Sequence, residues 1–331
     1  VFNLVPSLLQ QLDEYARGVA RDRFLELTRK RAEALTPGER EFVLTNFFMV
    51  DWEMNVRPLP RYWELLHKRG RDLRAVDLPV AAEGFGAGEL RDLQVLFNLA
   101  WMGFRAEEEE EVVRALRRKG RDFTEDDKRS LLEAQQRIVA KVAGAYRDLA
   151  ASGQAELSVA PFFHPLLPLV VDSSSALRAM PQATLPPRFG YPEDAREQVR
   201  RAFDYAQAHL GARPAGSWPS EGAVSPEALA LLAEEGARWC ATDEGILVRS
   251  EPRRERTEAN LYRPYLAGAD GREIAVLFRD RGLSELLTTD FPRLGAAEAV
   301  DVLLGHLGRI AAGREQGAEP PLVTLALDGE N

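Results

Sequence analysis

Two carboxylates stand in segments whose composition suits catalysis. Glu221 lies in the segment GSWPSEG and Asp328 in the segment LALDGEN, and each follows an apolar run or a tight turn. A pair of carboxyl groups that flank one bond, helped by aromatic side chains that cover sugar rings, is what glycoside hydrolysis requires. Each residue also has a structural interpretation, because Glu221 could merely precede a helix cap at Ser225 and Asp328 could form a turn with Gly329. Spacing alone leaves both interpretations open.

The sequence lacks the constellations that other hydrolases and metalloenzymes need. The single cysteine, Cys240, excludes an internal disulfide and a cysteine-based zinc or iron–sulfur site, and it lies in an apolar run with no histidine nearby. The four histidines are not spaced as metal ligands, and no GxSxG segment marks a nucleophilic serine. We therefore predict carboxylate chemistry with no metal and no cofactor.

Charge and hydropathy exclude two classes of partner. The chain of 331 residues carries 43 Lys and Arg against 52 Asp and Glu, a formal charge of −9. Neutralising phosphates requires a basic face, so we expect no nucleic-acid partner. No apolar run approaches the ~20 residues that a membrane helix needs, so we expect no membrane partner. The lack of cysteine pairs is compatible with a cytoplasmic location.

The secondary-structure pattern changes along the chain. From residue 7 to about 150, apolar residues recur at helical spacing, with Ser7 as the expected first N-cap and a flexible loop over 79–90. From Gly153 onward, short apolar runs alternate with helices, which favours an α/β fold with a parallel sheet closed into a barrel. The runs predicted as strands are 156–159, 238–242, 274–278 and 322–327.

Polar and aromatic side chains follow these predicted strands and a further loop. In parallel α/β folds, functional groups gather after the carboxyl ends of the strands. The residues at these positions are His164, Trp218, Glu221, Asp243, Glu244, Arg279, Asp280 and Asp328. We therefore expect these side chains to lie at one edge of the sheet.

Several segments resemble the conserved regions of glycoside hydrolase family 57, whose members act on α-glucans. The segment GQAEL (153–157) resembles the second region, GSWPSEG (216–222) the third and LDGEN (327–331) the fourth. PFFHPLLPL (161–169) is similar to a stretch of the α-amylase and amylopullulanase branch, and ATDEG and FRD also fit. The resemblance implies an incomplete (β/α)7 barrel with a helix-rich N-terminal half.

The resemblance also implies a retaining mechanism. Glu221 would be the nucleophile and Asp328 the general acid/base, with their carboxyl groups about 5–5.5 Å apart. The implied partner is an α-glucan polysaccharide or oligosaccharide, and no cofactor is implied.

Six further residues are expected to bind substrate or to support the nucleophile. His164 would bind a sugar hydroxyl, unless it only packs among prolines, and Trp218 would stack on a sugar ring, unless it belongs to the core. Glu156 would bind sugar or pair with an interior arginine. Asp243, Arg279 and Asp280 would form an ion-paired cluster that orients the nucleophile and the sugar hydroxyls, with a structural salt bridge as the alternative for Arg279 and Asp280.

The chain departs from the family pattern at both ends and at one site position. The HQP-type first region and the fifth region are absent, and Arg281 stands where a histidine is commoner. We therefore expect a piece of a longer polypeptide without the first barrel strand and a C-terminal part. Residues 1–150 would be a helix-rich insertion between early strands, and 151–331 would carry the catalytic carboxylates.

The sequence is compatible with four functions. The first is hydrolysis of α-1,4 and also α-1,6 glucans, and the second is a 4-α-glucanotransferase or branching enzyme, which excludes water from the acceptor site. The third is a non-catalytic glucan-binding protein, which the presence of both carboxylates disfavours. The fourth is a metal-dependent polysaccharide deacetylase, which the histidine pattern disfavours.

Overall fold

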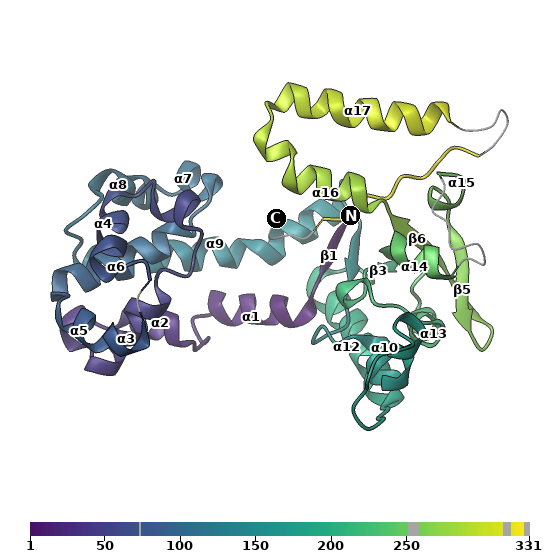
Figure 1. The fold of residues 1–331 in the computed structure, drawn as a ribbon, viewed down its shortest axis with the longest axis horizontal. Helices are drawn as coiled ribbons and strands as arrows, with labels where there is room; N and C mark the ends of the chain where they lie inside the picture. Colours follow the sequence, from purple (N-terminus) through teal and green to yellow (C-terminus); the bar gives the residue numbers. More distant parts are fainter. Residues whose placement is uncertain (73, 251–257, 314–318, 328–331) are drawn as a thin grey trace. The chain divides into compact units, whose positions relative to one another are not determined.

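The computed structural model describes residues 1–72, 74–250, 258–313 and 319–327 (Figure 1). The chain divides into two compact units, a helical unit of residues 11–142 and an α/β unit of residues 1–10 and 143–331. None of the described helices combines the length and the apolar character that crossing a bilayer requires.

The helical unit consists of helices joined by short turns. Its helices are α2 (Arg23–Arg29), α3 (Pro37–Asn46), α4 (Pro60–Arg69), α5 (Leu78–Glu83), α6 (Ala87–Ala100), α7 (Phe104–Glu109) and α8 (Glu111–Lys119). Parts of α1 (Pro6–Ala16) and α9 (Glu125–Ala151) also belong to it. Single 3₁₀ or π turns lie at Ala32–Ala34, Trp52–Val56 and Ala75–Asp77.

Two predictions about this half of the chain are wrong. The first helix begins at Pro6, so Ser7 lies inside it rather than capping it. The expected loop over 79–90 is largely helical, because α5 and α6 are separated only by a short turn that contains Gly84 and Gly86. The Glu89 side chain accepts a hydrogen bond from the Gly86 N–H at 2.9 Å and so begins α6 without a long loop.

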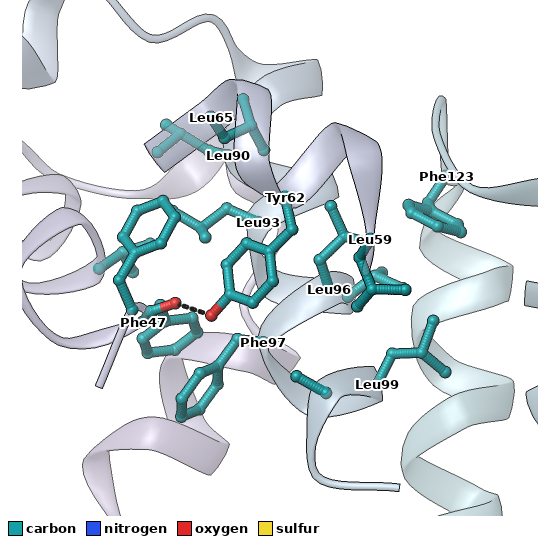
Figure 2. Close-up of a cluster of buried hydrophobic side chains, with 14 of the residues drawn as sticks. Phe47, Leu59, Tyr62, Leu65, Leu90, Leu93, Leu96, Phe97, Leu99 and Phe123 are labelled. Carbon is teal, nitrogen blue, oxygen red and sulfur yellow. Dashed lines mark hydrogen bonds between the residues drawn. The ribbon is translucent and has the colours of Figure 1, made fainter. Parts of the chain in front are cut away.

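Aromatic and leucine side chains form the core of the helical unit. Tyr62 and Phe47 are fully buried, and leucines of α4 and α6 surround them (Figure 2). The Phe47 and Phe97 rings stack with their centroids 4.5 Å apart. The Tyr62 hydroxyl donates a short hydrogen bond to the Phe47 carbonyl oxygen at the end of α3, so a buried polar group is paired within an apolar core.

The α/β unit is built on one six-stranded sheet with the order β1-β2-β3-β4-β6-β5. Its strands are β1 (Phe2–Leu4), β2 (Leu157–Val159), β3 (Gly216–Ser217), β4 (Trp239–Asp243), β5 (Tyr265–Ala269) and β6 (Arg272–Arg279). All neighbouring strands pair in parallel except β5, which pairs antiparallel with β6 at the edge. The five parallel strands β1, β2, β3, β4 and β6 therefore have their carboxyl ends on the same side of the sheet.

Helices accompany the sheet as the α/β pattern predicts. They are α10 (Leu167–Val171), α11 (Ala176–Ala179), α12 (Pro192–Leu210), α13 (Pro226–Glu234), α14 (Glu244–Ser250), α15 (Glu258–Leu261), α16 (Arg281–Thr289) and α17 (Ala296–Ala312). Short 3₁₀ turns lie at Ser173–Ser175, Ser220–Gly222 and Phe291–Arg293. Helix α13 packs against β5 and β6, and α12 against β2 (Figure 1). The Ser225 side chain caps α13 by accepting from the Ala228 N–H.

The sheet differs from the predicted barrel in one respect. The predicted strands at 156–159, 238–242 and 274–278 are confirmed as β2, β4 and β6. The run 322–327 forms only an isolated parallel bridge, between Thr324 and Arg279. Within the described residues β1 and β5 are edge strands, so the sheet is open there and a closed barrel is not formed.

The Tyr62 hydroxyl offers a test of the helical core. The substitution Tyr62→Phe should lower the free energy of unfolding by about 1–2 kcal/mol, because the buried Phe47 carbonyl then loses its partner. The matched control is Tyr191→Phe, where an exposed hydroxyl is removed and the change should be close to zero. Urea denaturation measures both, and equal effects would contradict the assignment.

Candidate active site

Glu221 lies on a tight turn directly after β3. At Gly216 an added Cβ would come within 1.9 Å of the Trp239 ring, so only glycine allows the two strands to approach this closely. The chain then turns through Ser220–Gly222, where Glu221 has the left-handed φ of 55° and an exposed side chain. A non-glycine residue in this conformation is strained, and such strain gathers at functional sites.

A residue of β4 hydrogen-bonds Gly222, at the end of this turn. The Thr242 hydroxyl, fully buried, donates to the Gly222 carbonyl at 2.5 Å. The Gly222 backbone also lies against Trp218, since an added Cβ would meet the indole ring at 3.4 Å. The turn that carries Glu221 is thus packed between Trp218 and the end of β4.

Two guanidinium groups and a backbone amide hold the carboxylate of Asp243, at the end of β4. Arg279 Nε donates to Asp243 Oδ2 at 3.0 Å. Arg281 donates from Nε to the same oxygen at 3.1 Å and makes a short bond from Nη2 to Oδ1. The Gly245 N–H also donates to Oδ1, at 2.8 Å. Each oxygen therefore receives two hydrogen bonds, which fills the acceptor capacity of a carboxylate.

These four hydrogen bonds bear on the expected role of Asp243, which stays a prediction. Burial would raise the pKa of Asp243, but the hydrogen bonds from Arg281, the Gly245 N–H and Arg279 together lower that pKa below its ordinary value. With its lone pairs occupied, the carboxylate has none left to accept bonds from sugar hydroxyls. The predicted ion-paired cluster forms, but Asp243 holds the arginines in it.

Arg279 joins the cluster to two other segments. Its guanidinium carbon lies 5.6 Å from the centre of the Trp218 ring, within the range of a cation–π contact. Its Nη1 donates to the Ala326 carbonyl at 3.3 Å. Ser284 bonds the same residue, because its Oγ accepts from the Ala326 N–H at 3.2 Å and donates to the Asp280 carbonyl at 2.6 Å. The segment that ends at Leu327 is thus attached to the end of β6.

Asp328 itself lies outside the described residues, so its expected approach to Glu221 stays a prediction. What the structure describes is the attachment of Ala326, two residues earlier, to Arg279 and Ser284. The Asp280 N–H donates to the Thr324 carbonyl at 2.9 Å and aligns the same segment with β6.

Two expected substrate-binding residues, Asp280 and Glu156, are hydrogen-bonded within the protein. Asp280 is buried at the N-cap of α16, where its carboxylate accepts from the Leu283 N–H at 2.9 Å and from the Tyr262 hydroxyl at 2.6 Å. Glu156 immediately precedes β2, at the amino end of the sheet, and accepts from Trp239 Nε1 at 2.8 Å. Glu156 thus lies at the opposite end of the strands from the candidates that follow them, and its partner among the described residues is the Trp239 indole.

His164 and Trp218 keep positions that suit contact with a ligand. His164 lies in the loop after β2, with an exposed side chain and a φ of 58°, so both His164 and Glu221 are presented from left-handed positions. Trp218 is half-buried beneath Arg279. Glu244, another residue after a strand, begins α14.

The sequence interpretation missed Arg281 as a member of the cluster and gave no role to Ser220. Ser220 Oγ is buried and has no hydrogen-bond partner among the described residues. The signals for Arg281 were its position two residues after Arg279 and its place where the family that the sequence resembles more commonly has a histidine. In the part of the chain that the structure describes, no group of three or more histidine, cysteine or acidic side chains is arranged to hold a metal ion.

Comparison with known proteins identifies the family. A sequence profile described as glycosyl hydrolase family 57 matches residues 14–331. The chain belongs to glycosyl hydrolase family 57. No curated protein matches the sequence of this family 57 chain.

Three solved structures match parts of the chain at low sequence identity. A 4-alpha-glucanotransferase from Thermococcus litoralis is 22% identical with a TM-score of 0.42, over 61% of this chain and 26% of that one. An alpha-amylase from Thermotoga maritima is 16% identical with a TM-score of 0.37, over 65% and 35%. A branching enzyme of the same family from Thermococcus kodakaraensis is 16% identical with a TM-score of 0.44, over 90% and 61%. The family 57 chain thus spans less than two thirds of each of these proteins.

Two buried serines of the Glu221 segment form a matched pair for a stability test. Ser217 Oγ donates to the Val159 carbonyl at 2.6 Å, whereas Ser220 Oγ has no described partner. Ser217→Ala should therefore cost about 1–2 kcal/mol of unfolding free energy, and Ser220→Ala should change it by less than about 0.5 kcal/mol. Urea denaturation of both variants measures these two changes in unfolding free energy. An equal or larger loss for Ser220→Ala would show that its hydroxyl has a partner after all.

The lowered pKa of Asp243 predicts a pH dependence of stability. A carboxyl group whose pKa is lower in the folded state stabilises the fold above its unfolded pKa, near 4, and loses that contribution as the pH falls through the folded pKa. The unfolding free energy of wild type should therefore exceed that of Asp243→Asn most at pH 7, and the difference should shrink below about pH 4. A difference that stays constant from pH 7 to pH 3 would contradict this.

Proposed function

We propose that the chain forms the catalytic part of a retaining glycoside hydrolase that acts on α-glucans, with Glu221 as nucleophile and Asp328 as general acid/base. Family membership supports a glycoside hydrolase or transglycosylase reaction. The observation that carries the assignment of residues is the cluster of Asp243, Arg279 and Arg281, which lies beside the turn of Glu221 and is bonded to the chain two residues before Asp328.

The first step of the proposed reaction forms a glycosyl-enzyme. A Glu221 carboxylate oxygen attacks the anomeric carbon, and the glycosidic bond breaks with its electron pair going to the departing oxygen. The carboxyl group of Asp328 gives its proton to that oxygen. The exposed position of Glu221 supports this role, because a nucleophile has to reach the bound sugar.

The second step releases the sugar. The Asp328 carboxylate takes a proton from water, the resulting hydroxide oxygen bonds to the anomeric carbon, and the ester bond to Glu221 breaks so that its carboxylate is restored. In a transferase a sugar hydroxyl would take the place of water. Hydrolysis of α-1,4 linkages, as in the α-amylase and amylopullulanase branch that the sequence resembles, is the reaction we propose.

The surrounding residues have supporting roles in this proposal. Trp218 offers its indole face to a sugar ring, and His164 offers a ring nitrogen to a sugar hydroxyl. Arg279, held by Asp243, places positive charge over the Trp218 ring, where the turn of Glu221 begins.

The proposed architecture is an incomplete (β/α)7 barrel. The parallel order of β1, β2, β3, β4 and β6, with Thr324 next to the end of β6, supports this proposal. In this proposal the insertion between early strands is the helical unit, residues 11–142, which lies in the sequence between β1 and β2 rather than over 1–150, and residues 151–331 carry the two carboxylates.

Substitution of the nucleophile tests the proposal. Glu221→Gln keeps the size of the side chain but removes the nucleophilic oxygen, so release of reducing ends from maltooligosaccharides, amylose and pullulan should fall roughly a thousandfold or more. Sizing the products of the wild-type protein distinguishes hydrolysis from transfer to another glucan.

The matched control for this experiment is Glu193→Gln, which neutralises an exposed glutamate in the first turn of α12. It should retain full activity. Near-full activity of Glu221→Gln, with the same unfolding midpoint as wild type, would overturn the assignment of the nucleophile.

A further inference from the structure

The first strand of the sheet reaches the turn of Glu221 through one side chain. Strand β3 contains only Gly216 and Ser217, and at Trp218 the backbone has left the ladder. The Asn3 carboxamide takes up both backbone groups of Trp218. Its Oδ1 accepts from the Trp218 N–H at 3.2 Å, and its Nδ2 donates to the Trp218 carbonyl at 3.3 Å.

The neighbouring strand fixes the orientation of this carboxamide. Ser158 lies opposite Asn3 in the β1–β2 register, and its buried hydroxyl donates to Asn3 Oδ1 at 2.9 Å. A backbone N–H can only donate and a carbonyl can only accept, so a flipped amide would set donor against donor and acceptor against acceptor. The Asn3 carboxamide thus takes the place of a backbone peptide group as the hydrogen-bond partner of Trp218, one residue beyond the end of β3.

This contact bears on the nucleophile because Trp218 begins the turn. Between Trp218 and Gly222 the backbone adopts the left-handed conformation at Glu221, which is maintained only if both sides of the turn are held. Thr242 holds the Gly222 side and Asn3 holds the Trp218 side. We propose that Asn3 is a positioning residue for Glu221, an inference that rests on the proposed function of Glu221.

The sheet should still form without this side chain, although the buried Ser158 hydroxyl then loses its acceptor and stability falls modestly. Asn3 is exposed, and β1 pairs with β2 through the backbone from Phe2 to Leu4 whatever residue stands at position 3. A loss of activity on substitution would therefore come from the geometry of the turn rather than from unfolding.

Two substitutions of Asn3 test its hydrogen bonds to Trp218, one by removing only the donor Nδ2 and the other by removing the whole carboxamide. In Asn3→Asp the oxygen that faces the Trp218 N–H and Ser158 is kept, but a negative oxygen faces the Trp218 carbonyl. In Asn3→Ala all three hydrogen bonds, two with Trp218 and one with Ser158, are lost. We expect kcat on maltooligosaccharides to fall about 10- to 100-fold in both variants, since misplacement of a reacting group by about 1 Å has effects of this size. The KM should rise by a smaller factor than kcat falls, because Asn3 also holds Trp218, which is proposed to bind the sugar, but hydrogen-bonds no other described residue with that proposed role.

A matched control asks whether any loss is specific to the turn. Asn46 donates a side-chain hydrogen bond of 2.8 Å to the Phe42 carbonyl in α3 of the helical unit. Asn46→Ala removes a bond of the same kind, so kcat and KM should both equal those of wild type.

The pH dependence of Asn3→Asp gives a readout that a purely structural role would not move. Below about pH 4 the aspartic acid is protonated and can again donate to the Trp218 carbonyl. The activity of Asn3→Asp relative to wild type should therefore rise as the pH falls through this range, whereas the relative activity of Asn3→Ala should stay constant.

The outcomes separate this inference from the proposal on which it rests. If Glu221→Gln is inactive but both Asn3 variants keep the wild-type kcat, Asn3 does not position the nucleophile. A fall in kcat that tracks a lowered unfolding midpoint, with no recovery of Asn3→Asp at low pH, likewise overturns it. If Glu221→Gln is active, the proposed function fails first.

Discussion

The carboxylate of Asp243 is the group on which the arrangement of the candidate site depends. It comes from the end of β4 and receives hydrogen bonds from Arg279 at the end of β6, from Arg281 in the first turn of α16 and from its own neighbour Gly245. Two cations so close together would repel each other without a shared anion. Because the carboxylate is mostly buried and its lone pairs are filled, both guanidinium groups are held in fixed directions.

Arg279 extends this constraint to the two segments that carry the proposed catalytic residues. Toward β3 it lies over the ring of Trp218, and toward the chain end it bonds the carbonyl of Ala326. Asn3, on β1, hydrogen-bonds the backbone of Trp218 from the direction opposite to β6 in the strand order. The turn of Glu221 is therefore held by contacts from β1, β4 and β6, which explains how an exposed residue can keep a strained backbone conformation.

The sequence predicted those parts of the fold that local patterns encode. Apolar runs located β2, β4 and β6, and the expected helix cap at Ser225 is the N-cap of α13. It could not reveal β3, which has two residues and no periodicity, nor the hairpin of β5, which pairs only through β6. The partners of side chains were also hidden, because they depend on which strands are neighbours. Asp280 was expected in the ion-paired cluster, yet Arg281 occupies that place, and Glu156 precedes its strand and so lies at the opposite end.

The central claim is that the carboxyl groups of Glu221 and Asp328 act on one sugar linkage from opposite sides. A crystal structure of the full-length protein with a bound maltooligosaccharide measures this directly, as the distance between the carboxyl groups of Glu221 and Asp328. The account predicts about 5–5.5 Å, the separation of a retaining enzyme. A separation beyond about 9.5 Å, which exceeds even the range of inverting enzymes, would contradict it.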